Sequence, residues 1–257
     1  MDTFVTPIIL GIVEGLTEFL PVSSTGHLII ATDLLHKNQE DLVSFNIIIQ
    51  FGAILAVVVL YWSRFKHLLN DNKLNWKHIA IATTPVLGIG FITRKFIKHY
   101  LFNPSVVTFT TIFVALIIIY VEKRKPKPVI HSLDELTYKD TFIIGMGQCF
   151  ALIPGVSRSG ATMLTAMMRK VDVKTSADFS FLISVPVISA ATLYELLKSY
   201  KDFHSDELTQ LFIGLFVSFV VAIIAIKSFL IILKKVGLTP FAYYRIIFGI
   251  LYFLYSR

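Results

Sequence analysis

Cysteine is nearly absent from this chain, and charged residues are scarce. The single cysteine, Cys149, excludes an internal disulfide and a cysteine-rich metal site. Only 16% of the 257 residues are charged, whereas 55% are hydrophobic, and the mean hydropathy is +0.71. The apolar residues come in long runs rather than in alternation, which is not typical of a soluble domain. The composition therefore predicts a helical protein that crosses a membrane several times.

A basic segment of the kind that opens a cleavable signal peptide is also missing from the first ten residues, MDTFVTPIIL. The formal net charge is +7, which is the sign expected of a nucleic-acid-binding protein. In a membrane protein, however, an excess of Lys and Arg marks the loops that face anionic cytoplasmic lipid. We therefore expect membrane lipids as partners and no nucleic acid.

The stretch EGLTEFLPVSSTGH, from Glu14 to His27, places polar groups inside an otherwise apolar run. Glu14 and Glu18 are four residues apart, so a helix puts them on one face, where like charges repel. A membrane protein retains such a pair when a cation lies between them or when they share a proton. Pro21 ends the helix, and the small residues after it can form a turn around an anion. His27 is close enough to Ser24 to act as its base, so the stretch indicates phosphate chemistry with a metal ion.

A second polar motif, ALIPGVSRSGAT, occupies residues 151–162. A shift of 134 positions aligns residues 22–26, VSSTG, with residues 156–160, VSRSG, and needs no gap across about forty residues. Arg158 can bind phosphate through two parallel hydrogen bonds, and a helix that starts near Gly160 adds its positive end. Besides Arg158, the residues expected to bind phosphate are Ser23, Thr25, Gly26, Ser157, Ser159, Gly160 and Thr162.

The repeat divides the chain into two halves, joined by a hydrophilic linker at residues 122–140. Each half, 1–121 and 141–257, is expected to hold a helical hairpin, at residues 4–35 and 141–170, followed by three spans. The spans are expected at residues 45–62, 79–93, 104–121, 178–197, 209–233 and 241–256. The hairpin helices are too short to cross a bilayer, so we expect them to be re-entrant. Three is an odd number, so the second half is inverted relative to the first. The expected fold is an all-α polytopic membrane protein with an inverted-topology repeat.

The distribution of Lys and Arg predicts the orientation. If the central linker is cytoplasmic, the cytoplasmic side holds twice as many of these residues as the opposite side. This orientation places the site on the outer face of the membrane.

A charge count predicts the cofactor. A diphosphate monoester carries about three negative charges, and two ionised glutamates add two, while Arg158 returns one. An excess of about four negative charges is untenable in a low-dielectric site. We therefore expect a divalent cation, Mg²⁺ or Ca²⁺, with Glu14 and Glu18 as its ligands.

Together the two motifs resemble the undecaprenyl-diphosphatase family, also known as the bacitracin-resistance family, of bacterial plasma membranes. The resemblance covers the whole chain, and neither motif departs from the family pattern. It implies hydrolysis of the C55 lipid diphosphate to its monophosphate, which recycles the carrier lipid for cell-wall synthesis. It also implies functional roles for six residues, Glu14, Glu18, Ser23, Ser24, His27 and Arg158.

Several alternatives remain open at this point. We expect Ser24 to attack the terminal phosphorus with His27 as base, after which water cleaves the phosphoserine. Direct attack by water is the rival mechanism, and Ser23 is the second candidate nucleophile. A flippase or transporter could use the same phosphate site, because inverted repeats with broken helices are a transporter design. Arg245, within a span, is assigned no role beyond the options of pairing with a hairpin carboxylate or binding lipid phosphate. A homodimer is compatible with the sequence.

Overall fold

The computed structural model describes residues 2–68, 74–124, 127–199 and 205–256, and nearly all of them are helical. The first half contains α1 (Asp2–Thr17), α2 (Ser24–Leu34), α3 (Gln39–Leu60), α4 (Trp62–His67), α5 (Trp76–Phe96), the π-helical turn η1 (Ile97–Leu101) and α6 (Pro104–Arg124). The second half contains the 3₁₀ turn η2 (Leu133–Glu135), α7 (Tyr138–Gln148), the 3₁₀ turn η3 (Cys149–Leu152), α8 (Arg158–Met168), α9 (Val173–Ser199), α10 (Ser205–Val236) and α11 (Thr239–Tyr255). In the linker, Ile130 forms an isolated parallel bridge with Val171.

Five helices are long and apolar enough to cross a membrane, namely α3, α5, α6, α9 and residues 207–236 of α10. The expectation of an all-helical, multi-pass membrane protein is therefore confirmed. The sixth expected span corresponds to α11, which has 17 residues and lies at the lower limit for crossing. Several helices begin earlier than the apolar runs, because polar residues cap them. The Asn38 side chain accepts the N–H of Glu40 at the start of α3, and Asn75 accepts that of Lys77 at the start of α5.

The offset of 134 positions recurs in the helix boundaries. The 11-residue helices α2 and α8 begin at Ser24 and Arg158, and the following helices α3 and α9 begin at residues 39 and 173. The connections between them also match, since His36 and Lys170 both have positive φ, of 52° and 63°. The two halves therefore share local structure in this region as well as sequence.

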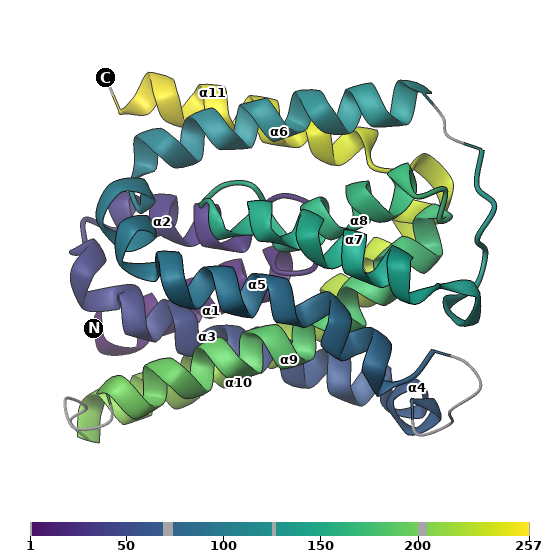
Figure 1. Cartoon of the computed structure of the whole chain (residues 1–257). Coiled ribbons are helices and arrows are strands. Elements are labelled where there is room, and N and C mark those ends of the chain that lie inside the picture. The colour runs from purple at the N-terminus through teal and green to yellow at the C-terminus, as the bar shows by residue number, and fades with distance from the viewer. Residues whose placement is uncertain (1, 69–73, 125–126, 200–204, 257) are drawn as a thin grey trace.

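The short helices α2, α7 and α8 occupy the centre of the molecule, and the longer helices flank them (Figure 1). On one side α6 packs along α11, and on the other α10 packs against both α1 and α3. From the central turns, α2 and α8 extend toward opposite edges of the view in Figure 1.

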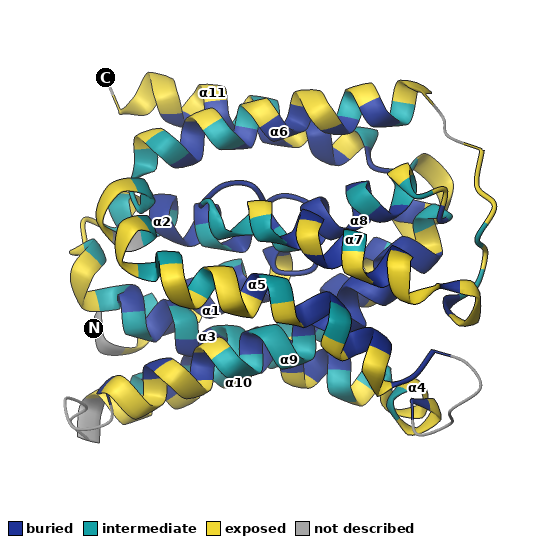
Figure 2. Cartoon of the chain, viewed as in Figure 1, coloured by how far each residue is buried: buried dark blue, intermediate teal, exposed yellow. Residues whose placement is uncertain are grey.

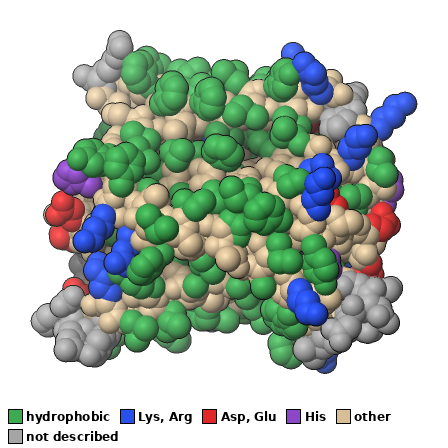
Figure 3. Space-filling view, viewed as in Figure 1, with side chains coloured by type: hydrophobic (Ala, Val, Ile, Leu, Met, Phe, Trp, Pro, Cys, Tyr) green, Lys and Arg blue, Asp and Glu red, His purple; other side chains and the backbone are tan. Residues whose placement is uncertain are grey.

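The interior of this arrangement is polar as well as apolar. The central turns and the helices beside them are largely buried, while the outward faces of the flanking helices are exposed (Figure 2). Figure 3 shows apolar side chains across the middle of one face, with Lys and Arg near its two lateral edges. An apolar band between two charged edges is the surface expected of a protein embedded in a bilayer.

Close helix contact holds α1 in place at the acidic motif. A Cβ atom at Gly15 would lie 2.6 Å from the carbonyl oxygen of Ser218 on α10, so no other residue fits there without a shift. Small residues allow membrane helices to approach closely. This contact fixes the rotation of α1 and therefore the direction in which Glu14 and Glu18 point.

Candidate phosphate-binding site at the two serine turns

The two serine turns, residues 18–27 and 152–160, have the same local structure at their helix starts. Ser23 has a φ of 75°, and its side chain accepts the backbone N–H of Gly26 at the start of α2. Ser157 has a φ of 77°, and its side chain accepts the N–H of Gly160 at the start of α8. Non-glycine residues with positive φ are uncommon and mark turns under constraint. Serine suits this position in both motifs, because its short side chain places a hydroxyl oxygen where it caps the following helix.

Hydroxyl groups tie the two turns together across the centre of the molecule. Ser159 Oγ donates to the carbonyl oxygen of Leu20 at 2.8 Å, and Ser157 Oγ lies 3.0 Å from Ser159 Oγ. Thr162 Oγ1 donates to Ser180 Oγ on α9 at 2.6 Å. Ser157, Ser159 and Thr162 are predicted to bind phosphate; in the structure the hydroxyls of Ser157 and Ser159 join the turns, and that of Thr162 joins α8 to α9. The two motifs, 134 residues apart in sequence, therefore form one site.

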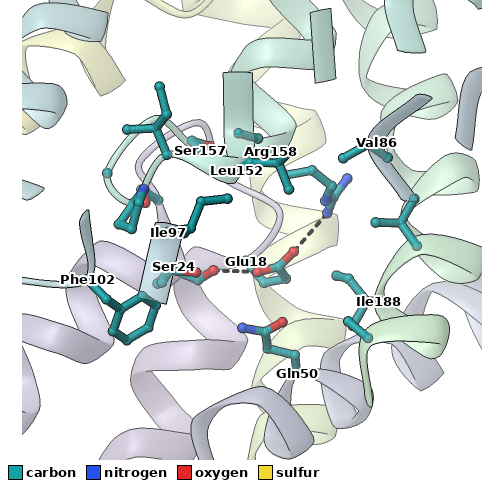
Figure 4. Close-up of a pocket in the computed structure, with 18 residues that line it drawn as sticks. Glu18, Ser24, Gln50, Val86, Ile97, Phe102, Leu152, Ser157, Arg158 and Ile188 are labelled. Carbon is teal, nitrogen blue, oxygen red and sulfur yellow. Dashed lines mark hydrogen bonds and ion pairs between the residues drawn. The ribbon is translucent and has the colours of Figure 1, made fainter. Parts of the chain in front are cut away.

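Glu18 lies at the centre of the site. Its Oε1 accepts a hydrogen bond from Arg158 Nη2 at 2.9 Å, and its Oε2 accepts one from Ser24 Oγ. Both charged side chains are nearly buried, with 11% of Arg158 and 6% of Glu18 exposed, so solvent screens the pair weakly. Arg158 Nη1 also donates to the carbonyl oxygen of Ser180 at 2.9 Å. Figure 4 shows Arg158, Glu18 and Ser24 as one connected chain of polar groups.

Glu14 lies one helical turn before Glu18 and is completely buried. As ionised groups, Glu14 and Glu18 have no proton to share, so neither Glu14 oxygen has a donor among the described residues, although the Glu14 carboxyl lies against that of Glu18 and also interacts electrostatically with Arg158. An unpartnered buried carboxylate is unstable unless a proton or a cation accompanies it. Glu18 lines the cavity described below, whereas Glu14 does not.

A cation site would draw on these two carboxylates. Within the described ranges, no group of three or more His, Cys, Asp and Glu side chains could hold a metal ion. Mg²⁺ in phosphoryl-transfer sites, however, is commonly bound through one or two carboxylates together with substrate phosphates and water. The orphaned oxygens of Glu14 beside Glu18 fit that arrangement.

His27 has both ring nitrogens engaged away from Ser24. Nδ1 lies 2.8 Å from the carbonyl oxygen of Ser23, and Nε2 lies 2.8 Å from the hydroxyl of Tyr244 on α11. A carbonyl oxygen can only accept, so Nδ1 carries a proton, and in the neutral ring Nε2 accepts the Tyr244 hydroxyl. The ring also stacks on Phe248, with centroids 4.1 Å apart. The structure therefore joins Ser24 to Glu18 and does not join it to His27.

Arg245 on α11 is a functional candidate to which the sequence analysis gave no role. Its side chain is fully buried and donates four hydrogen bonds, all to backbone carbonyl oxygens. Three of these acceptors lie in the serine turns, namely Pro21 at 2.9 Å, Val156 at 3.2 Å and Gly155 at 2.6 Å. The guanidinium thus holds both turns and has no carboxylate partner among the described residues. An arginine inside an apolar run was the signal that could have identified it.

A cavity of about 240 Å³ opens beside these groups. Glu18, Ser24 and Arg158 form part of its wall, together with Thr25 from the first turn. The rest of the wall is largely apolar and comes from α5, η1, the second turn and α9, including Val86, Ile97, Phe102, Leu152 and Ile188 (Figure 4). A cavity with hydrogen-bond donors at one part of its wall and apolar side chains elsewhere fits an amphiphile with an anionic head.

The fold and the site define a class: polytopic helical membrane proteins in which two serine-capped helix starts, an arginine and a glutamate line an internal cavity. The family model described as bacitracin resistance protein BacA matches residues 7–251. The chain belongs to this family.

Individual relatives match over nearly their whole length. The chain is 46% identical over 253 residues to an undecaprenyl-diphosphatase of Maridesulfovibrio salexigens, with 96% of each chain covered. It is 42% identical over 259 residues to undecaprenyl-diphosphatase 1 of Bacillus thuringiensis, with 98% of each chain covered. It is also 42% identical over 262 residues to an undecaprenyl-diphosphatase of Bdellovibrio bacteriovorus, covering 99% of this chain and 97% of the relative.

Proposed function

We propose that this protein hydrolyses undecaprenyl diphosphate to undecaprenyl phosphate and inorganic phosphate. The reaction regenerates the lipid carrier of cell-wall synthesis and would confer resistance to bacitracin. The observation that carries the proposal is the chain of hydrogen bonds from Arg158 through Glu18 to Ser24 at the wall of an otherwise largely apolar cavity. The near-full-length similarity to undecaprenyl-diphosphatases supports the same substrate.

The proposed first step is attack of Ser24 Oγ on the terminal phosphorus. The new Oγ–P bond forms as the bridging P–O bond breaks, and undecaprenyl phosphate leaves. The Ser24 proton passes to the Glu18 carboxylate, because Glu18 is the acceptor to which this hydroxyl is bonded. This assignment replaces His27 with Glu18 as the base. Water then cleaves the phosphoserine and releases inorganic phosphate; direct attack by water, with Ser24 holding the phosphate, remains the rival route.

Arg158 would stabilise the charge that develops on the phosphoryl oxygens, since its guanidinium already lies at the cavity wall. Its second donor group is fixed on the Ser180 carbonyl, which limits its freedom to swing away. Ser23 shapes the first turn as the cap of α2, so it is the weaker candidate nucleophile.

The net negative charge of the site with bound substrate favours a bound cation. The substrate brings about three negative charges and the two glutamates add two, whereas Arg158 and the buried Arg245 return two. The remaining excess of about three is costly at low dielectric constant. We propose that Glu14 and Glu18 hold Mg²⁺ or Ca²⁺, which would offset charge on the phosphates.

We also propose that the two halves form an inverted repeat in a bacterial plasma membrane, with re-entrant hairpins and the site open to the outer face. The constant offset between helix starts supports the repeat, and the excess of Lys and Arg on the linker side supports the orientation.

The decisive experiment measures phosphate release from undecaprenyl diphosphate by the purified protein in detergent. We expect turnover by the wild type, and losses of at least about a hundredfold in Glu18→Gln and Arg158→Ala. A lipid-phosphate flippase with the same site is the second candidate function, because helices broken near the middle of the membrane occur in transporters. Detergent separates the two, since a flippase releases no phosphate there. Absence of release by folded wild-type protein would refute the hydrolase.

A further inference from the structure

Gln50 is a polar residue on the cavity wall that the proposed reaction does not yet use. It lies near the middle of α3, between the apolar residues Ile49 and Phe51, and contributes to the same cavity as Glu18 and Ser24. Figure 4 shows its carboxamide pointing from α3 toward Glu18, on the side of the cavity opposite the serine turns. The side chain is partly exposed, so its polar atoms face the cavity and are not enclosed by protein.

The carboxamide of Gln50 has no hydrogen bond to any group in the described part of the chain, although it can donate two and accept two. A polar group at this depth in an apolar helix is unfavourable unless a partner satisfies it. Two nearby hydroxyl groups, those of Ser24 and Ser180, are satisfied by protein, whereas both Glu14 carboxylate oxygens and Arg158 Nε are not. Ser24 donates to Glu18, and Ser180 accepts from Thr162. The unmet hydrogen-bonding capacity of Gln50 therefore points to a ligand in the cavity.

The fold itself does not demand a glutamine at this position. At the 134-residue offset, Gln50 corresponds to Ser184 on α9. Ser184 is buried and donates to the carbonyl oxygen of Phe181 within its own helix. The equivalent helix of the second half, α9, therefore forms with a short side chain at this position, whose hydroxyl is hydrogen-bonded within the helix. The long carboxamide in the first half needs an explanation specific to the cavity.

We propose that Gln50 is a substrate-binding residue whose carboxamide donates hydrogen bonds to the diphosphate of the lipid. This inference rests on the proposed function, because it assumes a diphosphate head at Ser24 and Arg158. A neutral donor suits this wall of the cavity, since it binds an anion without competing with Arg158 for the Glu18 carboxylate. The contact forms with bound substrate and persists through the reaction, so its loss raises KM more than it lowers kcat.

Two substitutions test the proposal in the purified protein, with undecaprenyl diphosphate as the ligand. Gln50→Leu keeps a similar volume and suits an apolar helix, so we expect an unchanged or higher melting temperature. Its KM should rise roughly tenfold or more, as for loss of a hydrogen bond to a charged group, while kcat falls far less. Gln50→Glu keeps the shape but places a carboxylate against the phosphates, so its KM should rise further.

Asn46→Leu is the matched control, because Asn46 lies one turn earlier on the same face of α3 and does not line the cavity. Its KM should equal that of the wild type. If Gln50→Leu and Gln50→Glu both retain the wild-type KM while the wild type releases phosphate, the binding role is refuted and the hydrolase stands. If the folded wild type releases no phosphate, the proposed function fails first, and this inference fails with it.

Discussion

Replacing Arg245 tests whether one buried guanidinium holds the two serine turns in register. Each of its three bonds to the turns joins a charged donor to a carbonyl oxygen, which contributes about 1.5–3 kcal/mol. Arg245→Met also removes the fourth bond, to the carbonyl oxygen of Thr111, so simple addition gives an upper bound of about 6–12 kcal/mol. Removing a buried charge also removes its desolvation cost, while the carbonyl oxygens that it leaves unpaired each cost about 1–3 kcal/mol, so we expect a net loss of about 3–5 kcal/mol in the free energy of unfolding.

The assay compares melting temperatures in one detergent at one scan rate, because membrane proteins of this size often unfold irreversibly. A loss of this size corresponds to a decrease of roughly 6–20 °C in melting temperature for a chain of this length. Arg245→Lys keeps the charge but lacks the planar guanidinium group, so its melting temperature should lie between those of the wild type and Arg245→Met. Both variants should lose kcat about a hundredfold, since a small displacement of Ser24 relative to Arg158 impairs alignment.

Lys227→Met provides the control, because Lys227 is a basic residue in a span that is exposed at the protein surface. It should change neither the melting temperature nor kcat. In a chain of this size, 1 kcal/mol of stability shifts the melting temperature by about 2–4 °C. If Arg245→Met has a melting temperature within about 2 °C of the wild type and a normal kcat, the conformation of the turns does not depend on the guanidinium.

Three further predictions concern the chemistry. Ser24→Ala should lower kcat at least about a thousandfold and abolish trapping of a phosphoserine; near-normal turnover would favour direct attack by water. Chelation of divalent cations should abolish phosphate release, with recovery on adding Mg²⁺ or Ca²⁺, and Glu14→Gln should raise the cation concentration required; indifference to chelator would remove the metal from the mechanism. Tyr244→Phe removes the hydroxyl bonded to His27 and should lower kcat less than about tenfold, whereas a loss as large as that of Ser24→Ala would make His27 the base.

The residues of the two motifs could be identified from sequence because local spacing determines much of their geometry. Glu18 and Ser24 flank one proline-terminated turn, and the internal repeat marked Arg158 as belonging to the corresponding turn. The capping interactions that start α2 and α8 are also local, within three residues of Ser23 and Ser157. Local chemistry of this kind is visible in a single sequence.

The partners supplied by distant helices could not be predicted in the same way. His27 was close enough to Ser24 in sequence to be its base, yet it bonds to Tyr244, which is 217 positions away. Arg245 donates hydrogen bonds to carbonyl oxygens of both turns. Every residue has a backbone carbonyl, so the sequence does not indicate which of them Arg245 binds. Gln50 faces the cavity only because of the rotation of α3, which depends on packing against α9 and α10. Tertiary packing thus determines the partner of His27, the acceptors of Arg245 and the orientation of Gln50.

The proposed inverted repeat makes a prediction about sidedness that two equivalent positions can test. His36 and Lys170 lie 134 positions apart, follow α2 and α8, and are both exposed. A parallel repeat would place them on the same side of the membrane, whereas an inverted one places them on opposite sides.

The test introduces His36→Cys or Lys170→Cys into a Cys149→Ala background, which removes the native thiol. Cys149 is the one cysteine of the chain, so labelling in this background reports only the introduced residue. A membrane-impermeant thiol reagent applied to intact cells should label His36→Cys and spare Lys170→Cys, and inverted vesicles should give the reverse. The first residues of α2 and α8 lie together at the site. If the residues that follow the C-terminal ends of these helices, His36 and Lys170, are on opposite sides of the membrane, then the site lies inside the bilayer. Labelling of both positions from one side would exclude that geometry, and with it the re-entrant hairpins.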